Sequence, residues 1–487
     1  MSLRLRLTLP LALVIAGCVF EEVFLADADG VFTGSADSRF GATVESNFHA
    51  DNNADSDVAI GASNDGVVYI YTNPTGALTE ASANVTFTGA AGGEAGWSLA
   101  SGRVVSTSIP RDLVIGAPSE NGGRGKIYIL AGGGMSGALD SSDAWATLSG
   151  SQTNEYAGWD VTVGDYNADG HRDVAVGACG FGGDVGRVFV AFGPFANGSN
   201  RLLADATQNL IIQGVGSDSL FGCAVSTGDL DNNGRDDLVI GARGFRDTAL
   251  PPNGDIPGGA GRVYAIYNSL TVGSTTIDAG VLNVRHWTGT EASMALGTSV
   301  DASGDINGDG YDDIVMGADY RFCSSAPVFG PEECANFEPG SAFIVLGQAR
   351  AAGGRVLVTS GPIDTEADVV FNGTVSELGF GFRTAYVGDH DGDGNSDLAI
   401  STREGNQVYV YYGAATISTT SQTVVTEANA AAVLNADNAE TNFVGADISG
   451  WGDSNADGLS DILVGASGVQ DYILSPADPG GAWLFLE

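Results

Sequence analysis

Residues 229–242 read DLDNNGRDDLVIGA, an acidic loop that runs directly into an apolar segment ending in Gly-Ala. The second half of this stretch recurs along the chain, and seven copies can be aligned. They are DVAIGA from Asp57, DLVIGA from Asp112, DVAVGA from Asp173, DLVIGA from Asp237, DIVMGA from Asp313, DLAIST from Asp397 and DILVGA from Asp461. The copies lie 55 to 84 residues apart, which is typical of one structural unit repeated with loops of different length.

Each copy stands in the same order of segments, and this order predicts four strands. A Phe-Gly or similar segment precedes the acidic loop, as in LFGCAV from Leu220, and an alternating segment such as RVYAIY from Arg262 follows Gly-Ala. A fourth short segment, such as NVTFTG from Asn84, closes the unit. Period-two alternation with aromatic and β-branched residues is typical of strands. The sequence therefore predicts an all-β, seven-bladed β-propeller with four-stranded antiparallel blades.

The two ends of the repeat array complement each other. The sequence given stops in the third strand of the last unit, Trp483 to Leu486, whereas a lone fourth-strand sequence, GVFTG, begins at Gly30. We expect this N-terminal strand to complete the last blade, because ring closure leaves no free sheet edge. Residues 30–487 are thus predicted to form the propeller.

Residues 1–17, MSLRLRLTLPLALVIAG, have the features of a secretory signal peptide: two arginines, an apolar run too short to span a bilayer, and small residues. The next stretch, from Ile15 to Cys18, resembles the lipobox of bacterial lipoproteins, which implies cleavage before Cys18 and acylation of that cysteine. Ordinary signal cleavage nearby is the alternative. Residues 18–29 would then be a lipidated N-terminus and short tether. The expected location is extracytoplasmic, with lipid anchoring to the outer membrane or cell surface.

The chain is strongly acidic, with 20 Lys and Arg against 60 Asp and Glu and a formal net charge of −40. A field of this sign repels nucleic acid and anionic lipid, so we expect no nucleic-acid partner. Many of the carboxylates follow a fixed spacing, which points to a more specific role than surface solvation.

Five loops share the pattern Asp-x-Asp/Asn-x-Asp/Asn-Gly-x-x-Asp. Side-chain oxygens at positions one, three, five and nine and the carbonyl of position seven can converge on one ion, and glycine at position six permits the sharp turn. Such hard oxygen ligands select calcium over zinc, so we predict about five Ca²⁺ sites. The predicted ligands are Asp165, Asn167, Asp169, His171 and Asp173; Asp229, Asp231, Asn233, Arg235 and Asp237; Asp305, Asn307, Asp309, Tyr311 and Asp313; Asp389, Asp391, Asp393, Asn395 and Asp397; Asp453, Asn455, Asp457, Leu459 and Asp461.

Two further loops depart from this pattern. The first, from His49 to Asp57, keeps acidic or amide residues at positions three, five, seven and nine but has His49 at position one and Ala54 in place of glycine. Its calcium binding is left open. The second, from Val104 to Asp112, keeps Asp112 as its single carboxylate and is predicted to bind no ion.

The repeats resemble the FG-GAP repeats of the integrin α-subunit headpiece. The residues that carry the resemblance are Phe-Gly, the acidic loop and Gly-Ala-Pro, which is complete in GAPS from Gly116. The resemblance covers about residues 30–487, although the other copies lack the proline and the sixth reads Ile-Ser-Thr at this place. The resemblance implies a module for protein binding or adhesion, and together with the lipobox and the five acidic loops we expect this module to be membrane-anchored and stabilised by calcium.

The loops between the second and third strands are expected at the end of the propeller opposite the acidic loops. Two of them are long, and they contain arginines and aromatic residues, which interface hot spots favour. We predict that they bind a protein or a cell-surface glycan, with variable decoration of the fold as the alternative. The predicted contact residues are Arg243, Phe245, Arg246, Tyr320, Arg321, Phe322 and Phe329.

Four cysteines remain after Cys18, and an even count in an exported protein suggests disulfides. Cys323 and Cys334 bracket one loop and are expected to pair. Cys179 and Cys223 fall at the same end of neighbouring blades, so a bridge between them is plausible.

Catalytic motifs are not evident in the sequence. It contains four histidines but no His-Glu-x-x-His pair, and no Gly-x-Ser-x-Gly elbow. We therefore predict that the protein is not an enzyme. The alternative is an extracytoplasmic propeller hydrolase or lyase that acts on a polymeric substrate.

Overall fold

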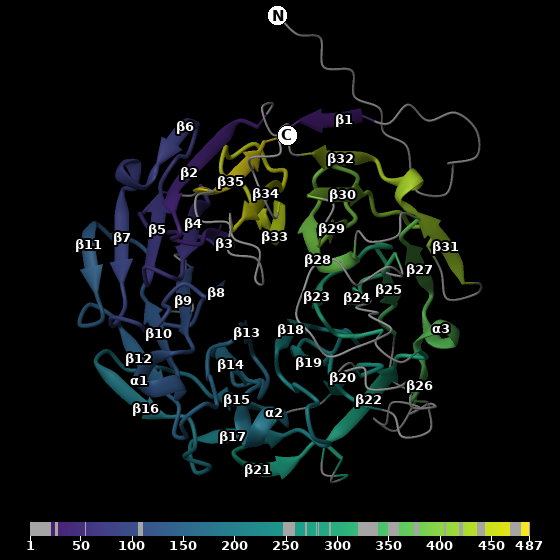
Figure 1. Ribbon diagram of the computed structural model, residues 1–487, viewed down its shortest axis with the longest axis horizontal. Helices are drawn as coiled ribbons and strands as arrows, with labels where there is room; N and C mark the ends of the chain where they lie inside the picture. The colour runs from purple at the N-terminus through teal and green to yellow at the C-terminus, as the bar shows by residue number, and fades with distance from the viewer. Residues whose placement is uncertain are drawn as a thin grey trace, which may run out of the picture.

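The computed structural model is a ring of seven β-sheets around a central opening (Figure 1). It describes residues 21–24, 28–53, 55–105, 111–246, 259–267, 270–278, 280, 282–291, 294–319, 339–348, 360–374, 379–403, 406–417, 422–435, 444–467 and 479–486. The all-β, seven-bladed propeller predicted from the repeats is confirmed. Blades are numbered here by the order of their innermost strands along the chain.

The strands of the first four blades are given from the innermost strand outward. Blade 1 contains β3 (Phe40–Phe48), β4 (Asp57–Ala62), β5 (Val67–Tyr71), β7 (Val85–Thr88) and β11 (Gly137–Asp140). Blade 2 contains β8 (Ser98–Gly102), β9 (Asp112–Ala117), β10 (Lys126–Leu130), β12 (Ala146–Ser149) and β16 (Ser199–Leu202). Blade 3 contains β13 (Val161–Gly164), β14 (Asp173–Ala178), β15 (Arg187–Ala191), β17 (Asn209–Gln213) and β21 (Gly273–Thr276). Blade 4 contains β18 (Ala224–Gly228), β19 (Asp237–Ala242), β20 (Arg262–Tyr267), β22 (Asn283–Thr288) and β26 (Gly361–Pro362).

The last three blades follow the same order. Blade 5 contains β23 (Val300–Gly304), β24 (Asp313–Ala318), β25 (Ser341–Val345), β27 (Val369–Asn372) and β31 (Thr423–Thr426). Blade 6 contains β28 (Phe380–Gly388), β29 (Asp397–Thr402), β30 (Gln407–Tyr411), β32 (Ala432–Asn435) and β1 (Glu21–Phe24). Blade 7 contains β33 (Val444–Gly452), β34 (Asp461–Ala466), β35 (Pro479–Phe485), β2 (Gly30–Ala36) and β6 (Gly76–Thr79). The described helices are single turns: α1 (Glu120–Gly123), α2 (Phe181–Asp184), α3 (Ile363–Glu366), η3 (Glu80–Ser82) and η4 (Glu427–Asn429).

The four antiparallel strands predicted for each blade are confirmed. Each sheet has a fifth strand in addition, which pairs in parallel with the outermost of the four. In six blades the segment that forms this fifth strand lies in sequence between the third and fourth strands of the next blade. For example, β11 lies between β10 and β12 of blade 2 in the sequence but pairs with β7 of blade 1. Each blade therefore covers the open edge of its neighbour, and this removes an exposed row of backbone donors and acceptors.

The N-terminal segment contributes two strands at the place where the ring closes. Strand β2 pairs antiparallel with β35, with Gly30 opposite Leu484, and occupies the fourth position of blade 7. Strand β1 pairs in parallel with β32 of blade 6, and it lies within residues 18–29, where a short tether is expected (Figure 1). The chain before the first repeat is thus attached to two blades.

The second strand of every blade is buried along its whole length, and in six blades its glycine is a point of contact with the next blade. A Cβ atom added to Gly61 would lie 2.2 Å from the carbonyl oxygen of Gly96 in the next blade. The sixth copy has Ser401 at the equivalent position, and its hydroxyl donates a hydrogen bond to the Gly445 carbonyl at 2.9 Å. This contact explains how the Ile-Ser-Thr copy packs without glycine.

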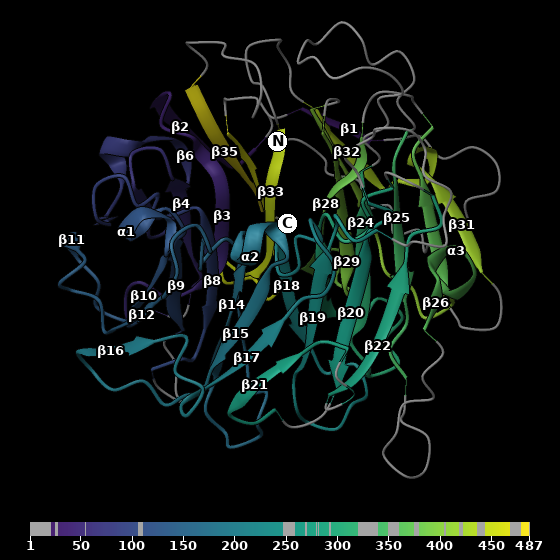
Figure 2. The same ribbon diagram turned by 60° about the horizontal axis from the view of Figure 1, so that its bottom comes forward.

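The strands run between two faces of the ring, as the tilted view in Figure 2 shows. At one face the first strand of each blade connects to the second through the acidic loop; we call this the acidic face. At the other, the opposite face, the second strand connects to the third, and the fourth leads to the next blade. All seven loops between first and second strands, including the second loop with its single carboxylate, therefore lie at the same end of the propeller.

Candidate metal centres on the acidic face

The five calcium-type loops share one backbone conformation. In the loop from Asp305 to Asp313, the residues at positions four and six, Gly308 and Gly310, have φ values of 68° and 90°. The N–H groups of Asp309 and Gly310 donate to the two carboxylate oxygens of Asp305, at 3.1 and 2.7 Å. The other four loops have the same positive φ values at positions four and six, and each position-six glycine donates to the position-one carboxylate. The loops are thus folded around their first aspartate.

The ninth aspartate is buried in all seven loops, where it joins the loop to the rest of its blade. Asp313 accepts hydrogen bonds from the N–H of Ile306 and from the N–H of Gly347, both at 2.8 Å. Burial raises the pKa of Asp313 to about 8, because desolvation outweighs these two hydrogen bonds. Asp112, in the loop without other carboxylates, accepts the equivalent pair from Val105 and Gly132. This position therefore has a structural role whether or not an ion is bound.

Carboxylate oxygens converge in two of the loops. Ligand atoms of Asp229, Asp231 and Asp237 all lie within 4.8 Å of one another, and so do those of Asp389, Asp391 and Asp397. The other three loops have asparagine at position three, so an amide oxygen stands where these two loops have a third carboxylate.

In the sixth loop, Oδ1 of Asp389 is buried and has no hydrogen-bond partner among the described residues. A buried carboxylate oxygen without a donor is costly in the absence of a cation. The chemistry of this donor set, all oxygen and mostly anionic, fits a hard divalent ion such as calcium.

The residue at position seven of each loop is predicted to bind the ion through its backbone carbonyl. In four of the loops the N–H of the position-seven residue donates to the position-five carboxylate, and the distances are 2.9 Å for His171, 3.1 Å for Tyr311, 2.8 Å for Asn395 and 2.9 Å for Leu459. Since position seven would contribute only its carbonyl oxygen, its variable side chain is consistent with that role.

Neighbouring loops are hydrogen-bonded to one another through position eight, a contact that the spacing of the metal ligands does not predict. Asp236 accepts the N–H of Asp165 in the preceding loop at 2.6 Å, and Asp312 accepts the N–H of Asp229 at 2.7 Å. A serine takes this role in the sixth loop, where Ser396 accepts from a backbone N–H of the fifth loop at 3.1 Å. The signal in the sequence is a polar residue at position eight. The position-one residues are therefore held partly by the next loop.

The first loop differs from the five at position one. His49 is buried, and its Nδ1 accepts the N–H of Arg111 in the second loop at 3.3 Å. The imidazole is thus engaged with the neighbouring loop, while Asp57 keeps its bond from the N–H of Ala50 at 2.5 Å. In the second loop, residues 106–110 lie outside the described residues.

The predicted partner-binding residues have different surroundings on the opposite face. Arg243 lines the central cavity, Phe245 stacks against the guanidinium of Arg262 at 3.6 Å, and Arg246 is 54 % exposed with Asp218 at 3.8 Å. The others, Tyr320, Arg321, Phe322 and Phe329, lie outside the described residues.

A disulfide joins Cys179 of blade 3 to Cys223 of blade 4, with Cα atoms 5.0 Å apart. The bridge between neighbouring blades that the positions of these two cysteines suggested is therefore present. Cys323 and Cys334 lie outside the described residues. The disulfide fastens two neighbouring blades at the opposite face.

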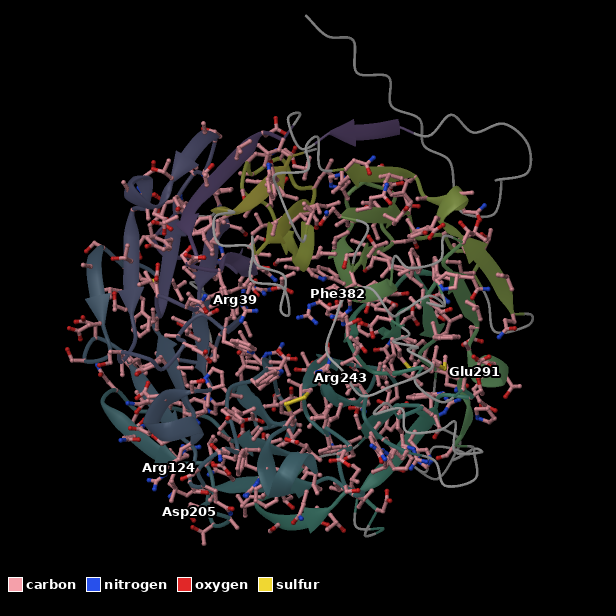
Figure 3. All side chains as sticks on the ribbon, viewed as in Figure 1. Arg39, Arg124, Asp205, Arg243, Glu291 and Phe382 are labelled. Atoms are coloured by element: carbon pink, nitrogen blue, oxygen red, sulfur yellow. A yellow bond between two sulfur atoms is a disulfide. The ribbon has the colours of Figure 1, made fainter. Side chains whose placement is uncertain are left out.

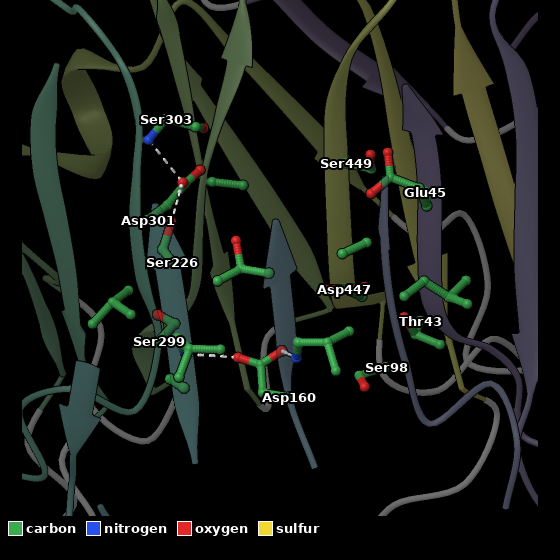
Figure 4. Close-up of a pocket in the computed structure, with 18 of the residues that line it drawn as sticks. Thr43, Glu45, Ser98, Asp160, Ser226, Ser299, Asp301, Ser303, Asp447 and Ser449 are labelled. Carbon is green, nitrogen blue, oxygen red and sulfur yellow. Dashed lines mark hydrogen bonds between the residues drawn. The ribbon is translucent and has the colours of Figure 1, made fainter. Parts of the chain in front are cut away.

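The innermost strands enclose a central cavity of about 1030 Å³ (Figure 4). Its carboxylates bridge neighbouring blades: Asp160 accepts the N–H of Val225 at 2.8 Å, and Asp301 accepts that of Tyr386 at 2.8 Å. Burial raises the pKa of Asp160 to about 7. The bridges join inner strands that belong to different sheets, so these carboxylates stabilise the ring.

No helix among the described residues has the length and apolar character needed to cross a membrane.

Comparisons with known proteins identify the repeats. The FG-GAP repeat family matches residues 157–190, 221–266 and 296–329. Integrin alpha-PS2 of Drosophila melanogaster is 28 % identical over 57 % of this chain and 18 % of its own length. Integrin alpha-5 of Xenopus laevis is 30 % identical over 46 % of this chain and 20 % of its own length. The chain thus spans about a fifth of these relatives.

A shorter match links the chain to an enzyme. The phosphatidylinositol-glycan-specific phospholipase D of Mus musculus is 32 % identical over 23 % of this chain and 13 % of its own length.

Proposed function

We propose that this integrin-α-like FG-GAP propeller is a calcium-stabilised, lipid-anchored module that binds a protein ligand outside the cytoplasm. The observation that carries the proposal is the separation of two surfaces. The carboxylates with metal-ligand spacing lie on the acidic face, so the opposite face is left for a partner. Similarity to integrin α subunits supports a binding or adhesion role.

Calcium would be held by positions one, three, five, seven and nine of the five loops. When bound, it supplies positive charge that offsets the repulsion between carboxylates. Two carboxylates about 5 Å apart repel by about 3 kcal/mol at an effective dielectric constant of 20. An ion with a Kd tenfold below the ambient calcium stabilises the fold by about 1.4 kcal/mol, or about 7 kcal/mol for five sites. Bound calcium would therefore lock loops that are hydrogen-bonded to the loops of neighbouring blades.

The proposed partner surface consists of the long loops of the opposite face. Arg246 is exposed there, and Arg243 stands beside the central cavity. Arginine and aromatic side chains are enriched at the energetic centres of protein interfaces. The relatives named above support a protein rather than a glycan as the ligand.

Acylation of Cys18 would bring the propeller close to a membrane. Strand β1 begins at Glu21, three residues after Cys18, and three extended residues span about 10 Å. The rim of blade 6, to which β1 is paired, would then lie near the lipid surface. Edge-on attachment of this kind leaves the opposite face accessible to partners. An outer-membrane or cell-surface location follows from this proposal.

A pull-down from the cell envelope in calcium tests the partner surface. We expect the triple variant Arg246→Gln, Tyr320→Ala, Phe322→Ala to keep its melting temperature and to lose capture of the partner by about tenfold or more. Arg124→Gln, an exposed arginine at the outer rim of the same face, is the matched control (Figure 3). Equal capture by wild type and triple variant would rule out this surface.

An enzyme remains the second candidate, because the phospholipase D match covers part of the repeats. Such an enzyme would act on a polymeric or lipid-linked substrate and would need a metal with an open coordination position. A crystal structure in calcium discriminates between the two functions: complete protein ligation at all five loops supports the binding module, and a water-bearing metal in a pocket supports the enzyme.

A further inference from the structure

Position eight of an acidic loop contacts position one of the loop before it through the backbone as well as through its side chain. Blades 5 and 6, which lie side by side (Figure 1), show both contacts. The Ser396 hydroxyl accepts the N–H of Asp305 at 3.1 Å. The N–H of Ser396 donates to the carbonyl of Asp305 at 2.9 Å. Both backbone polar groups of Asp305 are thus held by one residue of the next blade.

This contact continues from loop to loop across the acidic face. The same backbone bond joins three further pairs of loops, with distances of 3.0 to 3.2 Å: Asp312 to Asp229, Ser460 to Asp389 and Ser56 to Asp453. The side chain of Asp236 adds the link to Asp165 in the third loop. The predicted position-one ligand of every calcium-type loop is therefore bonded to the loop of the next blade.

The two ends of each contact belong to two predicted metal sites. Asp305 is the first ligand of the fifth loop, and Ser396 is directly followed by Asp397, the ninth ligand of the sixth loop. Asp397 is buried and accepts the N–H of His390 at 2.8 Å and that of Gly413 at 2.9 Å. Since consecutive residues share a peptide bond, an ion that fixes Asp397 also fixes Ser396, and through it the backbone of Asp305.

Further parts of the fifth loop rest on blade 6. A Cβ atom at Gly308, position four, would lie 2.3 Å from Oδ1 of Asn395 at position seven of the sixth loop. The carbonyl of Ile306 accepts the N–H of Ala414, which follows the third strand of blade 6, at 2.9 Å. The conformation of the fifth loop therefore depends on that of its neighbour at positions one, two and four.

We propose that Ser396 is a positioning residue for the calcium site of the fifth loop, and that an ion in the sixth loop raises the affinity of the fifth through this contact. The inference rests on the proposed calcium binding and names its regulation, in which neighbouring sites fill cooperatively. An ion in the sixth loop orders Ser396, so the fifth loop loses less conformational entropy when it binds its own ion. By linkage, an ion in the fifth loop raises the affinity of the sixth by the same factor.

Direct electrostatic interaction between the two sites has the opposite sign. A filled loop carries less negative charge than an empty one, so through space it attracts a second cation less strongly. The direction of the coupling therefore distinguishes contact through Ser396 from charge alone.

Terbium(III) is a suitable probe, because it binds hard oxygen ligands as calcium does and luminesces when a nearby tyrosine is excited. Tyr311 occupies position seven of the fifth loop, where the seventh loop has Leu459. The luminescence that is lost in Tyr311→Leu therefore reports the fifth loop. The remaining luminescence, which includes that sensitised by Tyr166 in the third loop, is the internal reference.

Ser396→Ala should raise the terbium Kd of the fifth loop about fivefold to tenfold, because the N–H of Asp305 loses its acceptor, and should change the reference Kd by less than about twofold. Ser396→Asn should restore the Kd of the fifth loop, because its neutral oxygen replaces the hydroxyl just as Asp312 accepts from the fourth loop. The matched control is Thr416→Ala, which removes an exposed hydroxyl from the segment of blade 6 beside the fifth loop and should have no effect. Melting temperatures in calcium show that each variant is folded.

Loss of a ligand in the sixth loop tests the coupling. Asp391 belongs to the carboxylate cluster of that loop. Asp391→Ala should raise the terbium Kd of the fifth loop about threefold when Ser396 is present, and should not raise it in Ser396→Ala.

Three results would overturn the proposal: an equal Kd of the fifth loop in wild type and Ser396→Ala, a parallel rise of the reference Kd in Ser396→Ala, or a lower Kd of the fifth loop in Asp391→Ala. The second would give Ser396 a structural role only, and the third is what electrostatics alone predicts. Failure of the proposed calcium binding has a different signature, because neither luminescence component would then appear and dialysis would find no bound calcium.

Discussion

Replacing the ninth aspartate of a calcium-type loop, Asp313→Asn, should reduce calcium stabilisation, whereas the same change in the second loop, Asp112→Asn, should not. The two residues form a matched pair. Both are buried, and each accepts one backbone N–H from its own loop and one from the segment after its third strand. They differ in their surroundings, since the loop of Asp313 has the full set of predicted ligands and that of Asp112 has none.

The magnitude follows from two separate contributions. Asparagine keeps one acceptor oxygen, so in either variant one buried N–H loses its partner and the free energy of unfolding falls by about 2 to 3 kcal/mol. Only Asp313→Asn also loses one calcium site, which contributes about 1.4 kcal/mol when calcium is at ten times the Kd. Chelation should then lower the stability of wild type and Asp112→Asn by about 7 kcal/mol, and that of Asp313→Asn by about 5.6 kcal/mol.

Urea denaturation with and without a chelator measures these differences. The quantity to compare is the change in unfolding free energy on chelation, because it cancels the hydrogen-bond loss common to the two variants. Equal changes for Asp112→Asn and Asp313→Asn would refute the reasoning, since the ninth aspartate would then have only its structural role.

Three further predictions concern stability. Reduction of the Cys179–Cys223 disulfide, or replacement of both residues by serine, should lower the unfolding free energy by about 4 kcal/mol in denaturant titrations, because the bridge closes a segment of 44 residues. Asp160→Asn should reduce the fall in melting temperature that accompanies a rise in pH from about 4 to 7. The folded-state pKa of Asp160 is raised to about 7, so between these pH values the folded wild-type protein binds more protons than its unfolded chain. A pH dependence of the melting temperature equal to that of wild type would contradict this. Phe32→Ala should lower the free energy of unfolding by about 3 to 5 kcal/mol, measured by thermal denaturation. The phenyl group of Phe32 in β2 is fully buried and packs edge-on against Tyr71, with ring centroids 4.9 Å apart, at the place where the propeller closes. A loss below about 1 kcal/mol would show that closure by β2 is dispensable.

The number and order of the blades could be predicted because their signals are local and repeated. The Gly-Ala segments are continuously apolar and become strands buried on both faces, such as β19. The fifth strands could not be predicted in the same way. Segments such as GALT in β6 and GSTT in β21 are short and partly exposed, and each pairs with a strand of the preceding sequence repeat or of the N-terminal segment and not with its sequence neighbours.

The candidate metal ligands were predictable for a similar reason. All ligands of one site lie within nine consecutive residues, so spacing alone places them together. The contacts between loops were missed, because Asp236 meets a backbone N–H that lies 71 residues earlier.

Calcium bound to the acidic loops is the central claim, and equilibrium dialysis of the purified protein against millimolar calcium tests it most directly. The account predicts about five calcium ions per chain, with the number falling by one in Asp313→Asn. Fewer than one ion per chain would contradict it, because the carboxylates of the acidic face would then serve some purpose other than metal binding.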